Sequence, residues 1–113
     1  FDISHSTLEL NSIFGDAMDG ISLANVDGFN IADNKMFFTN GNRNVAAVTA
    51  ASGTKGGNIH HNYGVLTGGV NAIYMLAGSL NNTADNNSFY AASAAVANGG
   101  TANIVGVNNR IVT

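Results

Sequence analysis

The sequence predicts an all-β protein built as a parallel β-helix, a solenoid whose short strands stack coil on coil. Three observations point to this fold. Asn and Gly, which favour turns, are abundant, with 18 Asn and 14 Gly among 113 residues. Short apolar runs recur along the chain, and 45% of the residues are hydrophobic, which argues against disorder. A frame of apolar residues and Asn also repeats at a spacing typical of solenoids.

The repeating frame has an apolar or Thr residue, a polar residue three positions later and an apolar residue seven positions after the first. The frame starts at Ile3, Ile31, Ile59, Thr83 and Val105, so the spacings are 28, 28, 24 and 22 residues. The polar position is Ser6 in the first copy and then Asn34, Asn62, Asn86 and Asn108. We expect the starting residues to stack inside the solenoid.

A further apolar stretch lies between successive frames. These stretches are residues 21–23, 45–48, 72–76 and 94–96. The first alternates Ile21, Ser22 and Leu23, as a half-buried strand does. Residues 91–97 also fit one helical turn, but the following Asn98 and two glycines favour a strand. Each repeat therefore holds about three strands, and residues 1–113 form one β-helix domain or fragment of about four to five coils, by the count of frames.

Charge is sparse, and this excludes several functions. Four Lys and Arg stand against seven Asp and Glu, so the net charge is −3 and charged residues make up only 10%. Binding to nucleic-acid backbones needs basic clusters, which the chain lacks. No apolar run approaches the ~18 residues of a membrane span, so no membrane insertion is expected. No cofactor or metal motif is recognisable. With only 10% charged residues, the surface of a lone monomer would be poorly covered by charge, which favours an oligomer.

Two segments and their lead-in resemble a known superfamily. The segments Asn30-Ile31-Ala32-Asp33-Asn34 and Asn58-Ile59-His60-His61-Asn62, with Asp19-Gly20-Ile21-Ser22-Leu23, look like the right-handed parallel β-helix of the pectate-lyase-like superfamily. There the Ile position stacks inward and the Asn forms an interior ladder at a tight turn. Sparse charge, absent Cys and abundant Asn, Gly, Ala and Ser are most similar to bacteriophage tailspikes within it.

The tailspike resemblance implies a function. Such proteins are homotrimers of the viral tail, part of the extracellular virion, and they recognise bacterial surface polysaccharide for host recognition. Many of them also cleave it as depolymerases, and whether this chain is catalytic stays open. Two alternatives remain: a non-catalytic structural shaft or adaptor, and a monomeric polysaccharide lyase or hydrolase. Hexapeptide and calcium-binding nonapeptide solenoids do not fit, because their repeat patterns are missing.

Two columns of polar residues follow from the frame. The regular register of the Asn column favours an internal amide ladder over a row of sugar-binding groups, because buried turn groups need hydrogen-bond partners. Two positions after each frame start, imidazole and carboxylate alternate. These residues are His5, Asp33, His61 and Asp85. We interpret them as a second, charge-complementary ladder at a turn, with sugar binding, acid–base chemistry and metal binding as the other readings.

Binding residues are expected at loops and exposed rings. Loops over residues 11–19 and 39–44 occupy the same corner of successive coils, and loops on a rigid scaffold often carry function. Their substrate-binding candidates are Asp16, Asp19, Asn42 and Arg43. Tyr63 and Tyr74 fall at positions that can face outward and stack on sugars. The remaining aromatic residues of the frame are expected in the core: Phe29, Phe37, Phe38, Phe89 and Tyr90.

Overall fold

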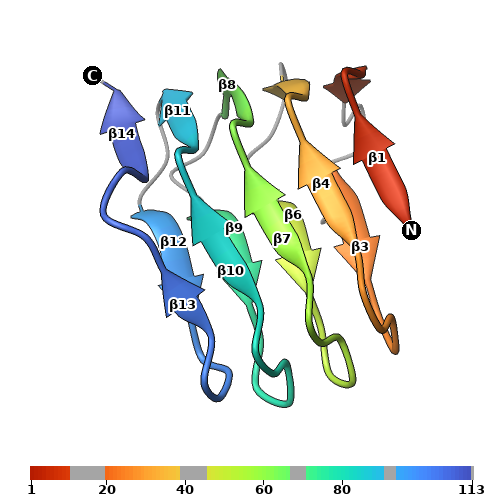
Figure 1. The fold of residues 1–113 in the computed structure, drawn as a ribbon. Helices are drawn as coiled ribbons and strands as arrows, with labels where there is room; N and C mark the ends of the chain where they lie inside the picture. The colour runs from red at the N-terminus through yellow and green to blue at the C-terminus, as the bar shows by residue number, and fades with distance from the viewer. Residues whose placement is uncertain (11–19, 39–45, 67–70, 91–93, 113) are drawn as a thin grey trace.

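Three parallel β-sheets form the sides of the molecule (Figure 1). The computed structural model describes residues 1–10, 20–38, 46–66, 71–90 and 94–112. Sheet 1 contains β1 (Asp2–Ser4), β4 (Asn30–Ala32), β7 (Asn58–His60), β10 (Thr83–Asp85) and β13 (Ile104–Val105). Sheet 2 contains β2 (Thr7–Leu10), β5 (Lys35–Phe38), β8 (Tyr63–Val65), β11 (Ser88–Tyr90) and β14 (Arg110–Val112). Sheet 3 contains β3 (Ile21–Leu23), β6 (Ala46–Ala50), β9 (Asn71–Met75) and β12 (Ala94–Asn98).

The chain visits the three sheets in turn, so neighbouring strands come from successive coils. The strand pairs in all three sheets are parallel. In Figure 1 sheet 1 runs across the view from red β1 to blue β13. This confirms the prediction of a parallel β-solenoid. It has about three turns, from β4 to β12, with β1 to β3 stacked on one end and β13 and β14 on the other.

Inward-facing side chains from all three sheets fill the interior. Ile31 and Ile59 of sheet 1 are completely buried, as are Met36 and Phe89 of sheet 2 and Val48 of sheet 3. Burying one such side chain stabilises a fold by about 1.5–3 kcal/mol relative to its exposure. In sheet 2, where strands alternate their side chains, the neighbours of buried Gly64 and Phe89 point outward. The outer face of sheet 2 is therefore set by the same register that forms the core.

The inward column of sheet 1 departs from the predicted frame in its fourth coil. The paired residues are Ile3, Ile31, Ile59, Ala84 and Val105. Thr83 instead pairs with Asn58 and is only half-buried, whereas Ala84 is completely buried. The prediction that Thr83 stacks inside was therefore wrong by one residue. A shift of one residue exchanges the inner and outer faces of a strand, so only one of the two positions can fill the core.

A left-handed backbone position recurs at the turn between sheets 1 and 2. His5, Asp33, His61 and Asn86 all have positive φ, between 53° and 56°. Asn, Asp and His tolerate this conformation better than most residues with a side chain. The alternation of residue types seen in the sequence therefore follows a backbone requirement. Asp85, predicted for this column, lies one residue earlier, on β10, where it pairs with His60.

Candidate functional site

A ladder of Asn side chains runs inside the turn between sheets 1 and 2. Asn34 Nδ2 donates to Asn62 Oδ1 at 3.0 Å, and Asn62 Nδ2 donates to Asn87 Oδ1 at the same distance. Asn87 Nδ2 continues the row to Asn109 Oδ1 at 2.8 Å. The same Oδ1 atoms accept backbone N–H groups from the preceding coil. The ladder thus satisfies turn groups that water cannot reach, which is a structural role.

Two members of the predicted ladder lie elsewhere. Asn87 and Asn109 take the places assigned to Asn86 and Asn108, while Asn34 and Asn62 stand where the frame put them. Asn108 is exposed. Asn87 follows from the one-residue shift of the fourth coil, since Ala84 and Asn87 keep the spacing of Ile31 and Asn34. In the fifth coil Val105 stays in register with Ala84, and the turn to Asn109 is one residue longer. The correction matters for function, because Asn86 and Asn108 then line an open hollow outside the turn and are not part of the interior ladder.

The turn column does not form a continuous row of alternating charges. His5 Nε2 lies 3.8 Å from Asp33 Oδ2, and both side chains are largely exposed, so this pair contributes little to stability. His61 has Asn86, not Asp85, as its neighbour on the next coil. Asp85 Oδ2 accepts a hydrogen bond from Asn86 Nδ2 at 3.0 Å instead.

A chain of hydrogen bonds leads from β1 to this turn. Asn30 Nδ2 donates to Asp2 Oδ1 at 3.1 Å, which turns Asn30 Oδ1 toward His60 Nε2 at 2.8 Å. An amide oxygen only accepts, so the neutral His60 ring carries its proton on Nε2. His60 Nδ1 then accepts from His61 Nδ1, 2.8 Å away. His61 is held by this bond and leaves its Nε2 for solvent or a ligand.

The outer face of sheet 2 carries a continuous group of aromatic and cationic side chains, which we call the sheet-2 face. Its first column passes through Lys35, Tyr63, Ser88 and Arg110 on successive strands. Its second column passes through Phe37, Val65, Tyr90 and Val112. Tyr63 is 42% and Tyr90 47% exposed. Exposed aromatic rings on adjacent strands give a flat apolar platform bordered by polar groups.

Contacts within the sheet-2 face hold several of these side chains in place. The rings of Phe37 and Tyr63 meet edge to face with centroids 6.3 Å apart. Lys35 Nζ lies 5.8 Å from the centre of the Tyr63 ring, within cation–π range. Arg110 Nε donates to Ser88 Oγ at 2.9 Å. Tyr63 and Arg110 are therefore oriented by neighbours on other coils and not by their own strands alone.

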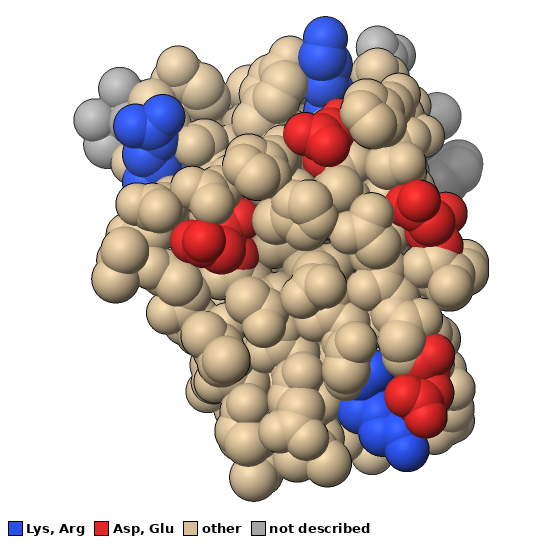
Figure 2. Space-filling view, viewed as in Figure 1, with Lys and Arg blue, Asp and Glu red and all other residues tan. Residues whose placement is uncertain are grey.

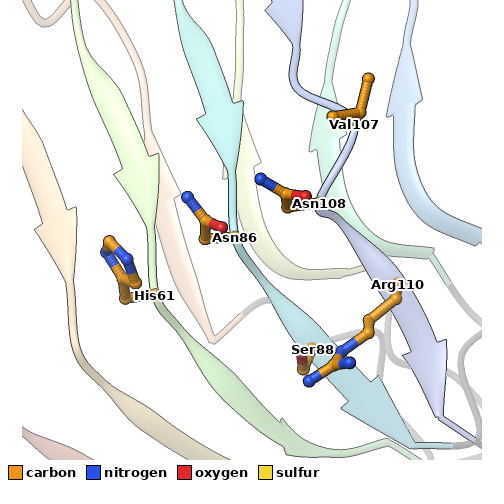
Figure 3. A pocket seen from close by; sticks show the side chains of 6 residues that line it. All are labelled: His61, Asn86, Ser88, Val107, Asn108 and Arg110. Atoms are coloured by element: carbon orange, nitrogen blue, oxygen red, sulfur yellow. Dashed lines mark hydrogen bonds between the residues drawn. The ribbon is translucent and has the colours of Figure 1, made fainter.

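Two open hollows meet at Arg110. The first has a volume of about 540 Å³ and is polar, and Figure 3 shows the six side chains that line it: His61, Asn86, Ser88, Val107, Asn108 and Arg110. The second has a volume of about 620 Å³ and is lined by Tyr63, Ser88, Tyr90, Arg110, Ile111 and Val112. Both volumes fall in the range of small-molecule sites. Ser88 and Arg110 belong to both hollows.

Cations of the described residues are distributed unevenly. Figure 2 shows how few charges interrupt the neutral surface of the molecule on the face that it draws. Lys55 is paired with Asp27 at 3.2 Å, at a different corner of the solenoid. Lys35 and Arg110 have no carboxylate partner within the part of the chain that the structure describes. The two unpaired cations thus bracket Tyr63 in a single column of the sheet-2 face.

The predicted binding residues divide into three groups. Asp16, Asp19, Asn42 and Arg43 lie outside the described residues. Tyr63 lies on the sheet-2 face, whereas Tyr74 is half-buried on β9 of sheet 3 and pairs with Thr49 and Ala97. No group of three His, Cys, Asp or Glu within the described ranges is placed to hold a metal ion. Nor do these ranges contain a helix long and apolar enough to cross a membrane.

Sequence reasoning missed Lys35, Ser88 and Arg110, and it assigned Phe37 and Tyr90 to the core. Phe29 and Phe89 are buried as expected, but Phe37 is half-buried on the outer face and Tyr90 is exposed. The Phe38 side chain lies outside the described part. The sequence contains a signal for the outward positions, because these residues alternate with inward Met36, Gly64 and Phe89 along their strands. The shifted frame hid this alternation in β11.

The geometry defines the class of protein: a parallel β-solenoid with an aromatic and cationic outer face on one sheet. No protein-family model, curated protein or solved structure matches the chain significantly.

Proposed function

We propose that the chain is a β-helix segment of a phage tailspike-like protein that recognises bacterial surface polysaccharide through the sheet-2 face. The proposal rests on one observation above all: exposed Tyr63 and Tyr90 lie side by side with unpaired Lys35 and Arg110. Aromatic rings offer apolar faces to sugar rings, and the neighbouring hydroxyl, amide and guanidinium groups offer hydrogen bonds to sugar hydroxyls. Recognition on an outer face also suits a ligand that is a long polymer.

The finer features of the fold belong to the same proposal. The solenoid is right-handed and belongs to the pectate-lyase-like superfamily, and the working unit is a homotrimer in the extracellular virion. Crossover connections between parallel strands of one sheet are right-handed in nearly all proteins, which supports the handedness. The interior Asn ladder agrees with the superfamily resemblance of residues 30–34 and 58–62.

Binding measurements on aromatic variants test the proposal. Tyr63→Ala and Tyr90→Ala should each weaken binding to a recognised capsule or O-antigen polysaccharide about tenfold, equivalent to ~1.4 kcal/mol, in isothermal titration calorimetry. Phe1→Ala is the matched control, because Phe1 is an exposed aromatic residue outside the sheet-2 face and its loss should leave the affinity unchanged. A reducing-end assay on the bound polymer reports any cleavage. A chain that binds no polysaccharide would favour the alternative of a structural shaft.

A further inference from the structure

We propose that the polysaccharide bound by the sheet-2 face is acidic and that a sugar carboxylate lies on Arg110, at the junction of the two hollows. This inference rests on the proposed function and adds the chemical class of its ligand. Arg110 alone among the described cations lines both hollows. A group held there lies between the aromatic platform of Tyr63 and Tyr90 and the amides of Asn86 and Asn108.

The Arg110 side chain is prepared to bind an anion. Its Nε–H is occupied by Ser88 Oγ at 2.9 Å, which fixes the plane of the guanidinium group. Four of the five guanidinium N–H donors remain, all on the two terminal nitrogens. Two parallel N–H groups match the two oxygens of a carboxylate, and such bidentate pairs are the stronger kind of hydrogen bond. No carboxylate of the described residues takes this position.

The column that contains Arg110 is suited to an extended polymer. Lys35, Tyr63, Ser88 and Arg110 lie on four successive strands, each step being about 4.8 Å. A chain laid along the solenoid therefore meets a cation, a ring, a hydroxyl and a second cation in order. Lys35 above Tyr63 adds positive potential at the far end of the column. A polymer with a carboxylate in its repeating unit can use both cations.

The overall charge does not oppose an acidic ligand here. The chain has a net charge of −3, but exposed charges more than ~8 Å apart are largely screened at physiological ionic strength. Asp85, on β10 of sheet 1, lies beside the polar hollow, where its Oδ2 accepts a hydrogen bond from Asn86 Nδ2 at 3.0 Å, and it forms no ion pair with Arg110. Glu9 lies at the opposite end of sheet 2, in register with Phe37. The carboxylate of the ligand is therefore assigned to the Arg110 end.

The polar hollow supplies further groups that suit an acidic sugar. Asn86 and Asn108 present amides, and His61 presents Nε2, since its Nδ1 is bound to His60. Figure 3 shows these three side chains in a row beside Arg110. Amide and imidazole groups hydrogen-bond to sugar hydroxyls, and amide N–H groups also donate to a carboxylate.

Matched pairs of ligands, each an acidic polymer and its uncharged form, test the inference on the unaltered protein. Alginate, hyaluronan and polysialic acid are compared with their carboxyl-reduced forms, which keep the linkage and lose the charge. We expect at least one acidic polymer to bind at least tenfold more tightly than its reduced form and to lose affinity as salt rises. Equal binding of the acidic and reduced forms would overturn the acidic ligand and leave the proposed function standing. Absence of binding to every polymer would count against both.

Substitutions of Arg110 and Lys55 test where the carboxylate of the ligand binds. Arg110→Gln should weaken binding of the acidic polymer about tenfold more than it weakens binding of the reduced polymer, because both polymers keep the hydroxyls that the guanidinium group can bind and only the acidic one has the carboxylate. Lys55→Gln makes the same change of charge at a site that is already paired with Asp27, so it should leave both affinities unchanged. If Arg110→Gln and Lys55→Gln behave alike, the assignment to Arg110 is wrong. Circular dichroism of each variant establishes that it is folded, and the ligand comparison does not depend on any variant.

Discussion

Asn residues in this chain perform two distinct tasks, and the distinction lies in single side chains. Asn34, Asn62 and Asn87 turn their amides inward and hydrogen-bond coil to coil. Asn25 and Asn86 instead occupy left-handed backbone positions, where a short polar side chain is tolerated. Composition alone shows many Asn residues but not which task each performs. Substitutions should distinguish the two tasks, because only the loss of an inward Asn side chain leaves buried hydrogen-bond partners unsatisfied.

Replacing a ladder residue should be costly. Asn62→Ala removes the acceptor of the Asn34 N–H and amide, and the donor to Ile31 O and Asn87 Oδ1. Buried unsatisfied groups cost about 1–3 kcal/mol each, so we expect the free energy of unfolding to fall by about 3 kcal/mol or more. Asn108→Ala is the control, since Asn108 is exposed, and it should change stability by less than ~0.5 kcal/mol. Urea unfolding measures both, and equal effects would contradict the ladder.

The two adjacent His residues should show different tautomers. Neutral His60 is expected to carry its proton on Nε2, donated to Asn30 Oδ1, and His61 on Nδ1, donated to His60. Nitrogen-15 chemical shifts of the two neutral rings distinguish these forms. Asn30→Leu removes the oxygen that selects the His60 tautomer, so His60 should then become a mixture of the two forms. An unaltered His60 spectrum in that variant would show that Asn30 does not determine the tautomer.

At the scale of the strand, sheet 2 combines a buried inner face with an outer face that carries the proposed binding site. Along β8, exposed Tyr63 and Val65 flank buried Gly64, and Gly64 packs directly against β5. A residue with no side chain at that inward position lets the two strands and the interior fit together. The outward rings and the inward glycine are therefore coupled, because a change in the packing of β8 would move Tyr63 relative to Phe37.

The inward glycine of β8 should be intolerant of substitution. A Cβ at Gly64 would overlap the carbonyl oxygen of Met36, which is backbone and cannot rotate away. We expect Gly64→Ala to lower the free energy of unfolding by about 2–3 kcal/mol, as overpacking of a core does. Gly99→Ala is the control, because its nearest atom would be Ala77 N at 3.6 Å, an ordinary contact. A neutral Gly64→Ala in thermal or urea unfolding would show that β8 and β5 are less closely packed.

At the scale of the molecule, the last coil exposes several apolar side chains. Its exposed apolar side chains are Ile104, Val105, Val107 and Ile111, and Val107 is 95% exposed. β12, β13 and β14 are edge strands of their sheets. Unpaired strand edges with apolar side chains are templates for association. Sparse charge adds to this tendency, since few like charges oppose contact between copies.

We expect the chain to self-associate, with the homotrimer as the proposed state. Sedimentation equilibrium at micromolar concentration should give the mass of three chains. Val107→Lys places a charge on the exposed coil and should shift the equilibrium toward monomer if this coil takes part in the contact. Leu80→Lys, at an exposed turn outside the last coil, is the matched control. A stable monomer for the unaltered chain would contradict the proposed assembly.

The sequence by itself determined the solenoid and its first three coils. Apolar residues and Asn at a spacing of 28 residues identified Ile31 and Ile59 as stacked and Asn34 and Asn62 as ladder residues. These features are readable because strand alternation and turn chemistry act over a few neighbouring residues. The same local rules placed Tyr63 on an outer face. They also predicted that tight turns, and not helices, connect the strands.

The tertiary structure alone decided the register of the later coils and the composition of the sheet-2 face. Asn86-Asn87 and Asn108-Asn109 are doublets, so the sequence pattern fits either member, and only stacking against Asn62 selects Asn87. Lys35 and Arg110 are 75 residues apart in the chain, yet they share one column because each coil returns to the same sheet. Such neighbours depend on the length of every intervening coil, and a change of one residue in any coil moves a side chain from the outer face to the core.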